Sequence, residues 1–260
     1  MRIINIALGQ LGCSHLGMED TIRQIAEAVE QVGQKKADYL LFPELYLEQE
    51  PDQTSLEMIA ATAQKHRVGV VLGYCETEQD TRYNTALFIG KNGEILGQYR
   101  KIHLLDFERN VFTPGDQCPV FDLPEGKIGL MISYDLMFPE VSRILAIKGA
   151  QLLLVLAANK FPPHPHQHVY LSSRALENHV FVAMANKVGL DGNHLYLGES
   201  TVVHPNGSTI YKCSNNVELP VISINLDEIE EARGRLDYLK NRRPAVYAKE
   251  GFGFTPTESL

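Results

Sequence analysis

Short apolar runs alternate with amphipathic segments along most of this chain. In residues 19–36 the apolar positions fall three or four residues apart, which predicts an amphipathic helix. Residues 3–8 and 38–42 are short, apolar and rich in branched or aromatic side chains, which is typical of buried strands. The same reasoning predicts helices at 55–66, 138–148, 166–178 and 227–235, and strands at 68–74, 83–89, 94–99, 127–132, 151–156, 180–186 and 219–225.

Hairpin signals occur among these elements. Gly93, in a Lys-Asn-Gly turn, and Gly207, in a Pro-Asn-Gly turn, stand where a hairpin needs a positive φ angle. Alternating helices and strands, with hairpins among them, predict an α/β fold with one mixed sheet or two sheets and helices on the outer faces. A long loop is expected at 101–117 and a polar tail at 241–260. No repeat or linker is visible, so residues 1–260 are predicted to form a single domain.

Composition narrows the function classes. The formal charge of −8 and the isoelectric point near 5.6 argue against a nucleic-acid-binding protein, which usually has a basic surface. No apolar run is long enough to cross a membrane, and the first residues do not resemble a secretory signal. The four cysteines are far apart in the sequence, as in reduced cytoplasmic proteins. We therefore expect a cytoplasmic protein with no membrane or nucleic-acid partner.

Polar residues follow three of the predicted strands. Glu44, Lys101 and Ser133 each come directly after an apolar strand, and Glu108 lies in the loop after Lys101. Active sites of α/β proteins gather at the carboxyl ends of strands, so these side chains could converge. Each also has a structural interpretation: a helix-start acid, a solvated lysine, an exposed ion pair of Glu108 with Arg109, and a helix cap. Their occurrence together, in this order, favours a site.

The order of the surrounding motifs resembles a known family. "FPEL", then "YRKIHL…FE…FTPG", then "GLMISYDLMFPEVSR" resemble the nitrilase or carbon–nitrogen hydrolase superfamily, with further similar stretches at 174–189, 198–207 and 242–247. The resemblance implies a four-layer αββα sandwich of two mixed sheets flanked by helices. It also implies hydrolysis of non-peptide C–N bonds in small amides by a Glu-Lys-Cys triad, with nitrile or N-carbamoyl hydrolysis as alternatives.

The family's roles fall on individual residues. By resemblance, Glu44 is the general base, Lys101 stabilises the oxyanion and Glu108 is the second glutamate. Position 133, the family's cysteine nucleophile, is serine here. The backbone N–H of Tyr134 would assist Lys101, and the reaction would pass through a thioester without metal or organic cofactor.

Serine is poorly suited to this triad. Moving a proton from a free thiol to a free glutamate costs roughly 6 kcal/mol, and a nearby lysine cation reduces that cost. A hydroxyl is a far weaker acid, and the G-x-S-x-G turn of many serine hydrolases is absent. We therefore expect little or no activity from Ser133. An engineered inactivating substitution is the favoured explanation, followed by a natural non-catalytic small-molecule-binding relative and a serine-using hydrolase.

A histidine-rich segment follows the strand at 151–156. His164, His166 and His168 alternate in a way that could bind a metal, but the prolines among them indicate a loop that leads into a helix. We expect this segment to shape the substrate pocket, with Asn159 and Phe161 at its border and no metal.

The resemblance also implies assembly. Family members form homodimers or larger homo-oligomers, so the outer helices and the tail at 241–260 are expected to contact a second copy.

Overall fold

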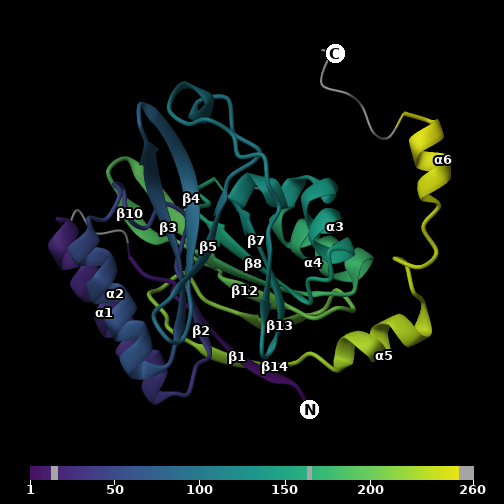
Figure 1. The fold of residues 1–260 in the computed structure, drawn as a ribbon, viewed down its shortest axis with the longest axis horizontal. Helices are drawn as coiled ribbons and strands as arrows, with labels where there is room; N and C mark the ends of the chain where they lie inside the picture. Colours follow the sequence, from purple (N-terminus) through teal and green to yellow (C-terminus); the bar gives the residue numbers. More distant parts are fainter. Residues whose placement is uncertain (13–16, 163–165, 252–260) are drawn as a thin grey trace.

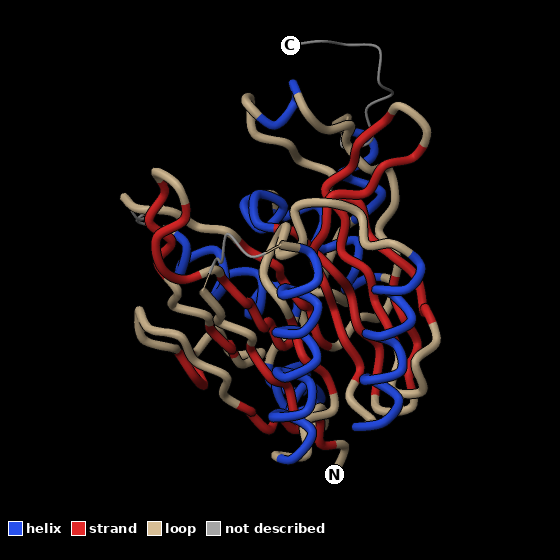
Figure 2. The backbone as a smooth tube through the Cα atoms, turned by 90° about the vertical axis from the view of Figure 1, so that its left-hand side faces the viewer, coloured by secondary structure: helices blue, strands red, loops and turns tan. Residues whose placement is uncertain are grey.

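Two β-sheets face each other, and helices cover both outer faces (Figure 1). The computed structural model describes residues 1–12, 17–162 and 166–251, apart from the side chain of Arg235. Figure 2 shows the two helices of one outer layer lying side by side along the strands. This arrangement confirms the predicted α/β sandwich of four αββα layers.

The first sheet has the strand order β14-β1-β2-β3-β4-β5, and α1 and α2 cover it. Strands β1, β2 and β3 run parallel, whereas β14, β4 and β5 join them in antiparallel pairs. The strands are β1 (Ile3–Leu8), β2 (Tyr39–Leu41), β3 (Gly69–Glu78), β4 (Thr81–Ile89), β5 (Ile95–Arg100) and β14 (Val221–Asn225), and the helices are α1 (Met18–Gln34) and α2 (Gln53–His66).

The second sheet has the order β13-β12-β9-β8-β7-β6, and α3 and α4 cover it. Its centre, β7-β8-β9, is parallel. The strands are β6 (Val120–Leu123), β7 (Gly126–Ile132), β8 (Leu152–Ala157), β9 (Phe181–Asn186), β12 (Thr201–Val203) and β13 (Thr209–Lys212), and the helices are α3 (Pro139–Ile147) and α4 (Gln167–Asn178). Each sheet therefore has a parallel centre with antiparallel edges.

Alternating side chains separate three apolar layers. Ile6 of β1 and Leu130 of β7 point into the core between the sheets, whereas Leu40 of β2 packs under α1 and α2, and Leu153 of β8 packs under α3 and α4. Fully burying one such side chain stabilises a fold by about 1.5–3 kcal/mol, so the docking of the sheets is a major source of stability.

Several elements differ from the prediction. Strand β6, the hairpin of β10 (Val188–Asp191) and β11 (His194–Leu197), and helix α6 (Pro244–Lys249) in the tail were not predicted. The strand that ends at Ile132 continues into a 3-10 turn, Ser133–Met137, before α3 begins, rather than directly into an α-helix. Helix α5 (Glu228–Arg235) lies where a helix was expected.

Three cysteines, Cys75, Cys118 and Cys213, are free thiols, and Cys13 lies outside the described residues. Across the described part of the chain, no helix combines the length and the apolar character needed to cross a membrane.

Candidate active site

Glu44 lies at the turn after β2, at the carboxyl end of the parallel strands. Its backbone N–H donates to the carbonyl of Ala157, at the end of β8, over 3.3 Å, which links the two sheets at this point. The turn fits closely against β3, because a Cβ atom on Gly73 would lie 2.5 Å from the carbonyl oxygen of Pro43. A larger residue at position 73 would therefore displace the turn that carries Glu44. The side chain of Glu44 is buried.

Lys101 comes directly after β5 and is only 1% exposed. Its backbone N–H donates to the carbonyl of Asn84 over 2.8 Å. The ammonium Nζ lies 2.7 Å from Glu44 Oε1 and 2.7 Å from Glu108 Oε1. The solvated lysine considered from sequence is therefore wrong: Lys101 is a buried cation between two carboxylates.

Glu108 begins a short 3-10 turn, Glu108–Asn110, in the loop after Lys101. Its Oε2 accepts hydrogen bonds from Lys101 Nζ at 2.9 Å and from the backbone N–H of Leu105 at 2.8 Å. An exposed ion pair with Arg109 is not observed, since Arg109 approaches Asp106 instead, at 3.9 Å. The loop thus folds back to place a buried carboxylate against Lys101.

The charges of this triad fix the protonation of the lysine. Burial by itself lowers the pKa of Lys101, but the carboxylates of Glu44 and Glu108 more than compensate and raise it above its usual value. Lys101 is therefore a cation at neutral pH, suited to stabilising negative charge and unsuited to removing a proton.

Glu44 has one occupied and one available oxygen. Oε1 accepts from Lys101 and from Asn84 Nδ2 at 2.7 Å, while Oε2 has no hydrogen-bond partner among the described residues. The Oε2 atom can therefore accept a proton. Asn84, which orients this carboxylate, was missed from the sequence, although an asparagine within a predicted strand is uncommon and is an available signal.

Ser133 occupies a strained turn at the end of β7. Its φ angle of +43° lies in the left-handed region, which non-glycine residues seldom adopt. The preceding residue, Ile132, pairs with Leu156 of β8, and the next residue of β8, Ala157, accepts the N–H of Glu44. The backbones of Ser133 and Glu44 therefore approach the same end of β8 from opposite sheets.

Asp135, two residues after Ser133, accepts hydrogen bonds from residues on both sides of Lys101 in the sequence. This fully buried carboxylate accepts from the Tyr99 hydroxyl at 2.7 Å and from the His103 backbone N–H at 2.9 Å. It also accepts from the N–H of Ile132 at 3.1 Å. Asp135 therefore couples the turn at position 133 to the segment that carries Lys101. The sequence showed this aspartate but not its distant partners.

The other predicted residues surround this region. Tyr134 is half-buried in the first turn of the 3-10 helix, where backbone N–H groups have no acceptor inside the helix. The Asn159 N–H donates to Asn186 Oδ1 at 2.7 Å, and the Phe161 N–H donates to the Leu195 carbonyl at 2.7 Å. The unpredicted β10–β11 hairpin therefore holds the segment around Phe161.

The histidine segment is only partly described. His164 lies outside the described residues, whereas His166 and His168 are at the start of α4. Among the side chains that the structure describes, no three His, Cys, Asp or Glu residues are grouped so that they could hold a metal ion.

Comparison with known proteins supports these observations. Residues 5–234 match the family model of the carbon-nitrogen hydrolases. The chain is 35% identical over 219 residues to an (R)-stereoselective amidase from Pseudomonas sp, which covers 79% of this chain and 80% of that protein. The chain therefore belongs to the carbon–nitrogen hydrolase family, a class of enzymes.

Solved structures of similar chains share the fold. A carbon-nitrogen hydrolase from Helicobacter pylori G27 has a TM-score of 0.87 at 26% identity, covering 95% of this chain and 98% of its own. A glutamate-to-glutamine mutant of the amidase from Nesterenkonia sp. AN1 has a TM-score of 0.84 at 27% identity, covering 95% and 96%. In that mutant the acetamide moiety of fluoroacetamide is covalently added at the active site cysteine.

Proposed function

We propose that this fold, with cysteine at position 133, hydrolyses small amides to a carboxylic acid and ammonia. The observation that carries the proposal is the buried triad of Glu44, Lys101 and Glu108 at the end of the strands, beside the strained turn at position 133. Two carboxylates and one ammonium buried together cost desolvation energy, which a purely structural core does not require.

The triad supports a two-step mechanism. Glu44 Oε2 takes the thiol proton, and the thiolate attacks the amide carbon. The Lys101 ammonium and the Tyr134 N–H stabilise the negative charge that develops on the amide oxygen. The C–N bond breaks, and Glu44 returns the proton to the departing ammonia. Water, deprotonated by Glu44, then attacks the thioester carbon, the C–S bond breaks, and Glu44 returns the proton to the departing thiolate as the acid is released. Glu108 orients Lys101, and no step uses a metal or organic cofactor.

Ser133 leaves the machinery without its nucleophile. A serine mechanism needs a stronger base than a carboxylate, and the raised pKa of Lys101 argues against a neutral lysine in that role. The chain as written is therefore proposed to be inactive or strongly impaired while its pocket is retained. The active-site cysteine of the related Nesterenkonia amidase supports a cysteine at the equivalent position. An engineered substitution is favoured over a natural binding protein or a serine hydrolase.

The amide is favoured over a nitrile or an N-carbamoyl compound as the substrate. The (R)-stereoselective amidase and the Nesterenkonia amidase, which resemble this chain, both carry amidase in their names. A non-catalytic binding protein is the alternative proposal. The presence of Glu44, Lys101 and Glu108 together argues against it, because binding alone does not require a base.

The Ser133→Cys variant tests the function. Ammonia release is measured for both forms over small amides, nitriles and ureido acids, with Ser133→Cys/Glu44→Gln as the catalytic control and Ser133→Cys/Glu48→Gln as the surface control. Turnover of amides by the cysteine form, at least 100-fold above the serine form and lost only with Glu44→Gln, is the expected result. Equal activity of the serine form contradicts this account of position 133, and a cysteine form inert towards the whole panel favours the binding protein.

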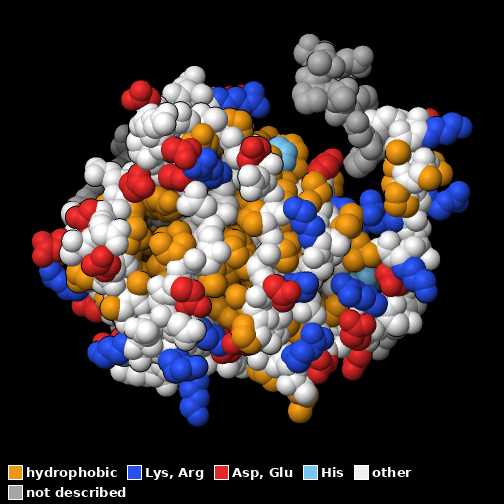
Figure 3. Space-filling view, viewed as in Figure 1, with side chains coloured by type: hydrophobic (Ala, Val, Ile, Leu, Met, Phe, Trp, Pro, Cys, Tyr) orange, Lys and Arg blue, Asp and Glu red, His pale blue; other side chains and the backbone are white. Residues whose placement is uncertain are grey.

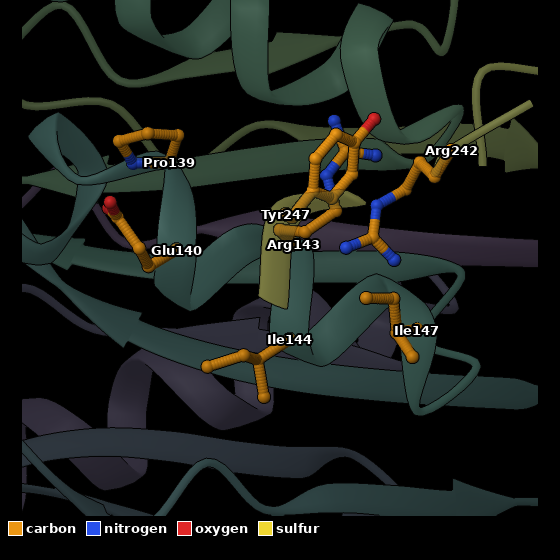
Figure 4. Close-up of a pocket in the computed structure, with 7 residues that line it drawn as sticks. All are labelled: Pro139, Glu140, Arg143, Ile144, Ile147, Arg242 and Tyr247. Carbon is orange, nitrogen blue, oxygen red and sulfur yellow. The ribbon is translucent and has the colours of Figure 1, made fainter. Parts of the chain in front are cut away.

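The same fold is proposed to act as a single-domain subunit of a homodimer. Helix α6 has no buried side chain and stands away from the sheets (Figure 1). Apolar side chains lie beside Lys and Arg side chains on this helix (Figure 3). A cavity of about 410 Å³ lies between α3 and the tail, and Ile144, Ile147, Arg242 and Tyr247 are among the side chains that border it (Figure 4). A second copy that covers this face would bury these groups.

A further inference from the structure

A buried guanidinium lies against the turn that carries position 133. Arg174 belongs to α4, in the layer outside the second sheet, and is only 5% exposed. Its Nε donates to the carbonyl of Leu136 at 3.0 Å, and one of its terminal nitrogens donates to the carbonyl of Met137 at 3.1 Å. Leu136 and Met137 end the 3-10 turn that begins at Ser133, so Arg174 binds the far end of that turn.

These two hydrogen bonds require a guanidinium rather than any other cation. The last carbonyls of a helical turn have no donor within the turn, and that end of the turn carries partial negative charge. The planar guanidinium of Arg174 supplies a positive charge together with several N–H donors in a fixed geometry. A lysine at this position would supply the charge without the geometry.

The orientation of the guanidinium is itself fixed. Its other terminal nitrogen donates to Glu177 Oε1, three residues further along α4, at 2.7 Å. This ion pair offsets part of the cost of burying the positive charge. All three nitrogens of Arg174 therefore have acceptors, and the guanidinium cannot rotate away from the turn without losing a hydrogen bond.

The turn at position 133 is thus held at both ends. Asp135 accepts the N–H of Ile132 at 3.1 Å, before position 133, whereas Arg174 binds the carbonyls at the end of the turn. The φ angle of +43° at Ser133 is unfavourable for a residue other than glycine, and such a conformation persists only where its surroundings impose it. The nucleophile position and the N–H of Tyr134 lie between these two attachments.

We propose that Arg174 is a positioning residue for the reaction. It contacts no reacting atom in the mechanism above. By holding the end of the turn, it sets where the thiol at position 133 and the N–H of Tyr134 lie relative to Lys101. Loss of Arg174 lets the turn shift, so kcat falls while substrate binding is retained. This inference rests on the proposed amidase function of the site.

Alkylation of the thiol in Ser133→Cys tests this role without amide turnover. Iodoacetamide is the probe, and the parent serine form gives the background from the other cysteines. Arg174→Met is expected to lower the second-order rate constant about 10-fold. It should also shift the pH dependence to higher pH, because the thiolate is stabilised less by Lys101. Arg174→Lys should recover only part of the rate.

The matched control is Arg23→Met. Arg23 pairs with Asp20 across three residues of α1, but both side chains are largely exposed, at 61% and 48%. This variant should leave alkylation and hydrolysis unchanged. Each rate is measured well below the thermal unfolding midpoint of that variant. If Arg174→Met does not fold, Arg174→Lys carries the test, and alkylation that is unchanged in the lysine variant overturns the positioning role.

Hydrolysis of small amides by Ser133→Cys separates the two proposals. Adding Arg174→Met is expected to lower kcat about 10- to 100-fold with KM nearly unchanged. Alkylation that depends on Arg174 without any amide turnover overturns the amidase proposal and leaves the positioning role standing. Turnover and alkylation that are both unchanged in Arg174→Met overturn the positioning role and leave the amidase proposal standing. A raised KM with unchanged kcat also overturns it, because that result would indicate contact with the substrate.

Discussion

The hydroxyl of Tyr99, in the first sheet, donates a 2.7 Å hydrogen bond to Asp135, which belongs to the turn after the second sheet. Tyr99 precedes Lys101 by two residues, and Asp135 follows Ser133 by two. This hydrogen bond, together with the one from the His103 backbone N–H to Asp135, holds the segment with the cation against the segment with the nucleophile position. Burial and the adjacent Asp135 raise the pKa of the Tyr99 hydroxyl well above its usual value, so it remains a donor.

Replacing Asp135 should lower the activity, although Asp135 takes no part in the proposed reaction. In Ser133→Cys, a further Asp135→Asn change turns one acceptor oxygen into a donor that faces other donors. We expect kcat to fall about 10- to 100-fold, since small displacements of catalytic groups have effects of this size. Stability should fall by about 2 kcal/mol.

A control variant and a second measurement distinguish an effect of Asp135 on the position of the catalytic groups from an effect on the stability of the fold. Asp122→Asn, at an exposed site paired with Lys127, should change neither quantity. The pH dependence of thiol alkylation at position 133 should shift in Asp135→Asn, because the distance to Lys101 changes. An unshifted profile with lowered stability would show that Asp135 is only structural.

Lys101→Met should destabilise the fold strongly, because it leaves two buried carboxylates without a counter-ion. A loss of about 3–5 kcal/mol at pH 7 is expected from urea unfolding, against almost none for Lys65→Met. Since the pKa of Lys101 is raised in the folded state, its contribution is complete below the unfolded value of about 10.4 and decreases as pH rises above it. The gap between parent and Lys101→Met should therefore narrow above about pH 10.4. A gap that stays constant there would contradict the raised pKa.

How far the sequence could predict this site depends on the separation of the partners. Glu44, Lys101 and Ser133 were visible because each ends a strand in a recognisable motif. The links of Asp135 to Tyr99 and His103 join residues more than 30 positions apart, and nothing in the local sequence pairs them.

The overlooked elements have similarly physical reasons. The β10–β11 hairpin turns at Gly192-Asn193, a known hairpin signal, but its strands are only four residues long. Helix α6 buries none of its side chains, so the apolar periodicity that predicts helices was absent. The alternating pattern predicted one mixed sheet or two sheets with helices outside, whereas the strand order of the two sheets depends on packing that sequence alone does not describe.

Glu76 offers a test at acid pH. This carboxylate of β3 accepts hydrogen bonds from Arg100 at 2.6 and 2.9 Å and from Thr85 and Gln98. Burial raises its pKa, but these donors, Arg100 above all, outweigh burial and hold the pKa below its usual value. Its stabilisation is therefore present above about pH 4.3 and is lost as pH falls through the folded value.

Glu76→Gln should lower the free energy of unfolding by about 2 kcal/mol at pH 7, and the difference should shrink below about pH 4. Glu78→Gln is the matched control, because Glu78 pairs with the same arginine but is largely exposed. Chemical unfolding across pH 3 to 7 measures both. A constant difference down to pH 3 would exclude a depressed pKa for Glu76.

The assembly proposal is tested by charging its apolar face. Ile144→Asp and Val246→Asp, at exposed positions of α3 and α6, should shift a dimer towards monomer in light scattering. Met58→Asp, at an exposed site on α2, is the control and should leave the mass unchanged. A parent chain that is monomeric at every concentration counts against the dimer.

Glu44 and Lys101 follow strands of one sheet, whereas position 133 follows a strand of the other. A refolding chain with both sheets formed but not yet docked therefore has no complete active site. During refolding of the Ser133→Cys variant, the rate at which ammonia release returns would therefore report the docking of the two sheets. Circular dichroism records the formation of strands and helices and does not report that docking.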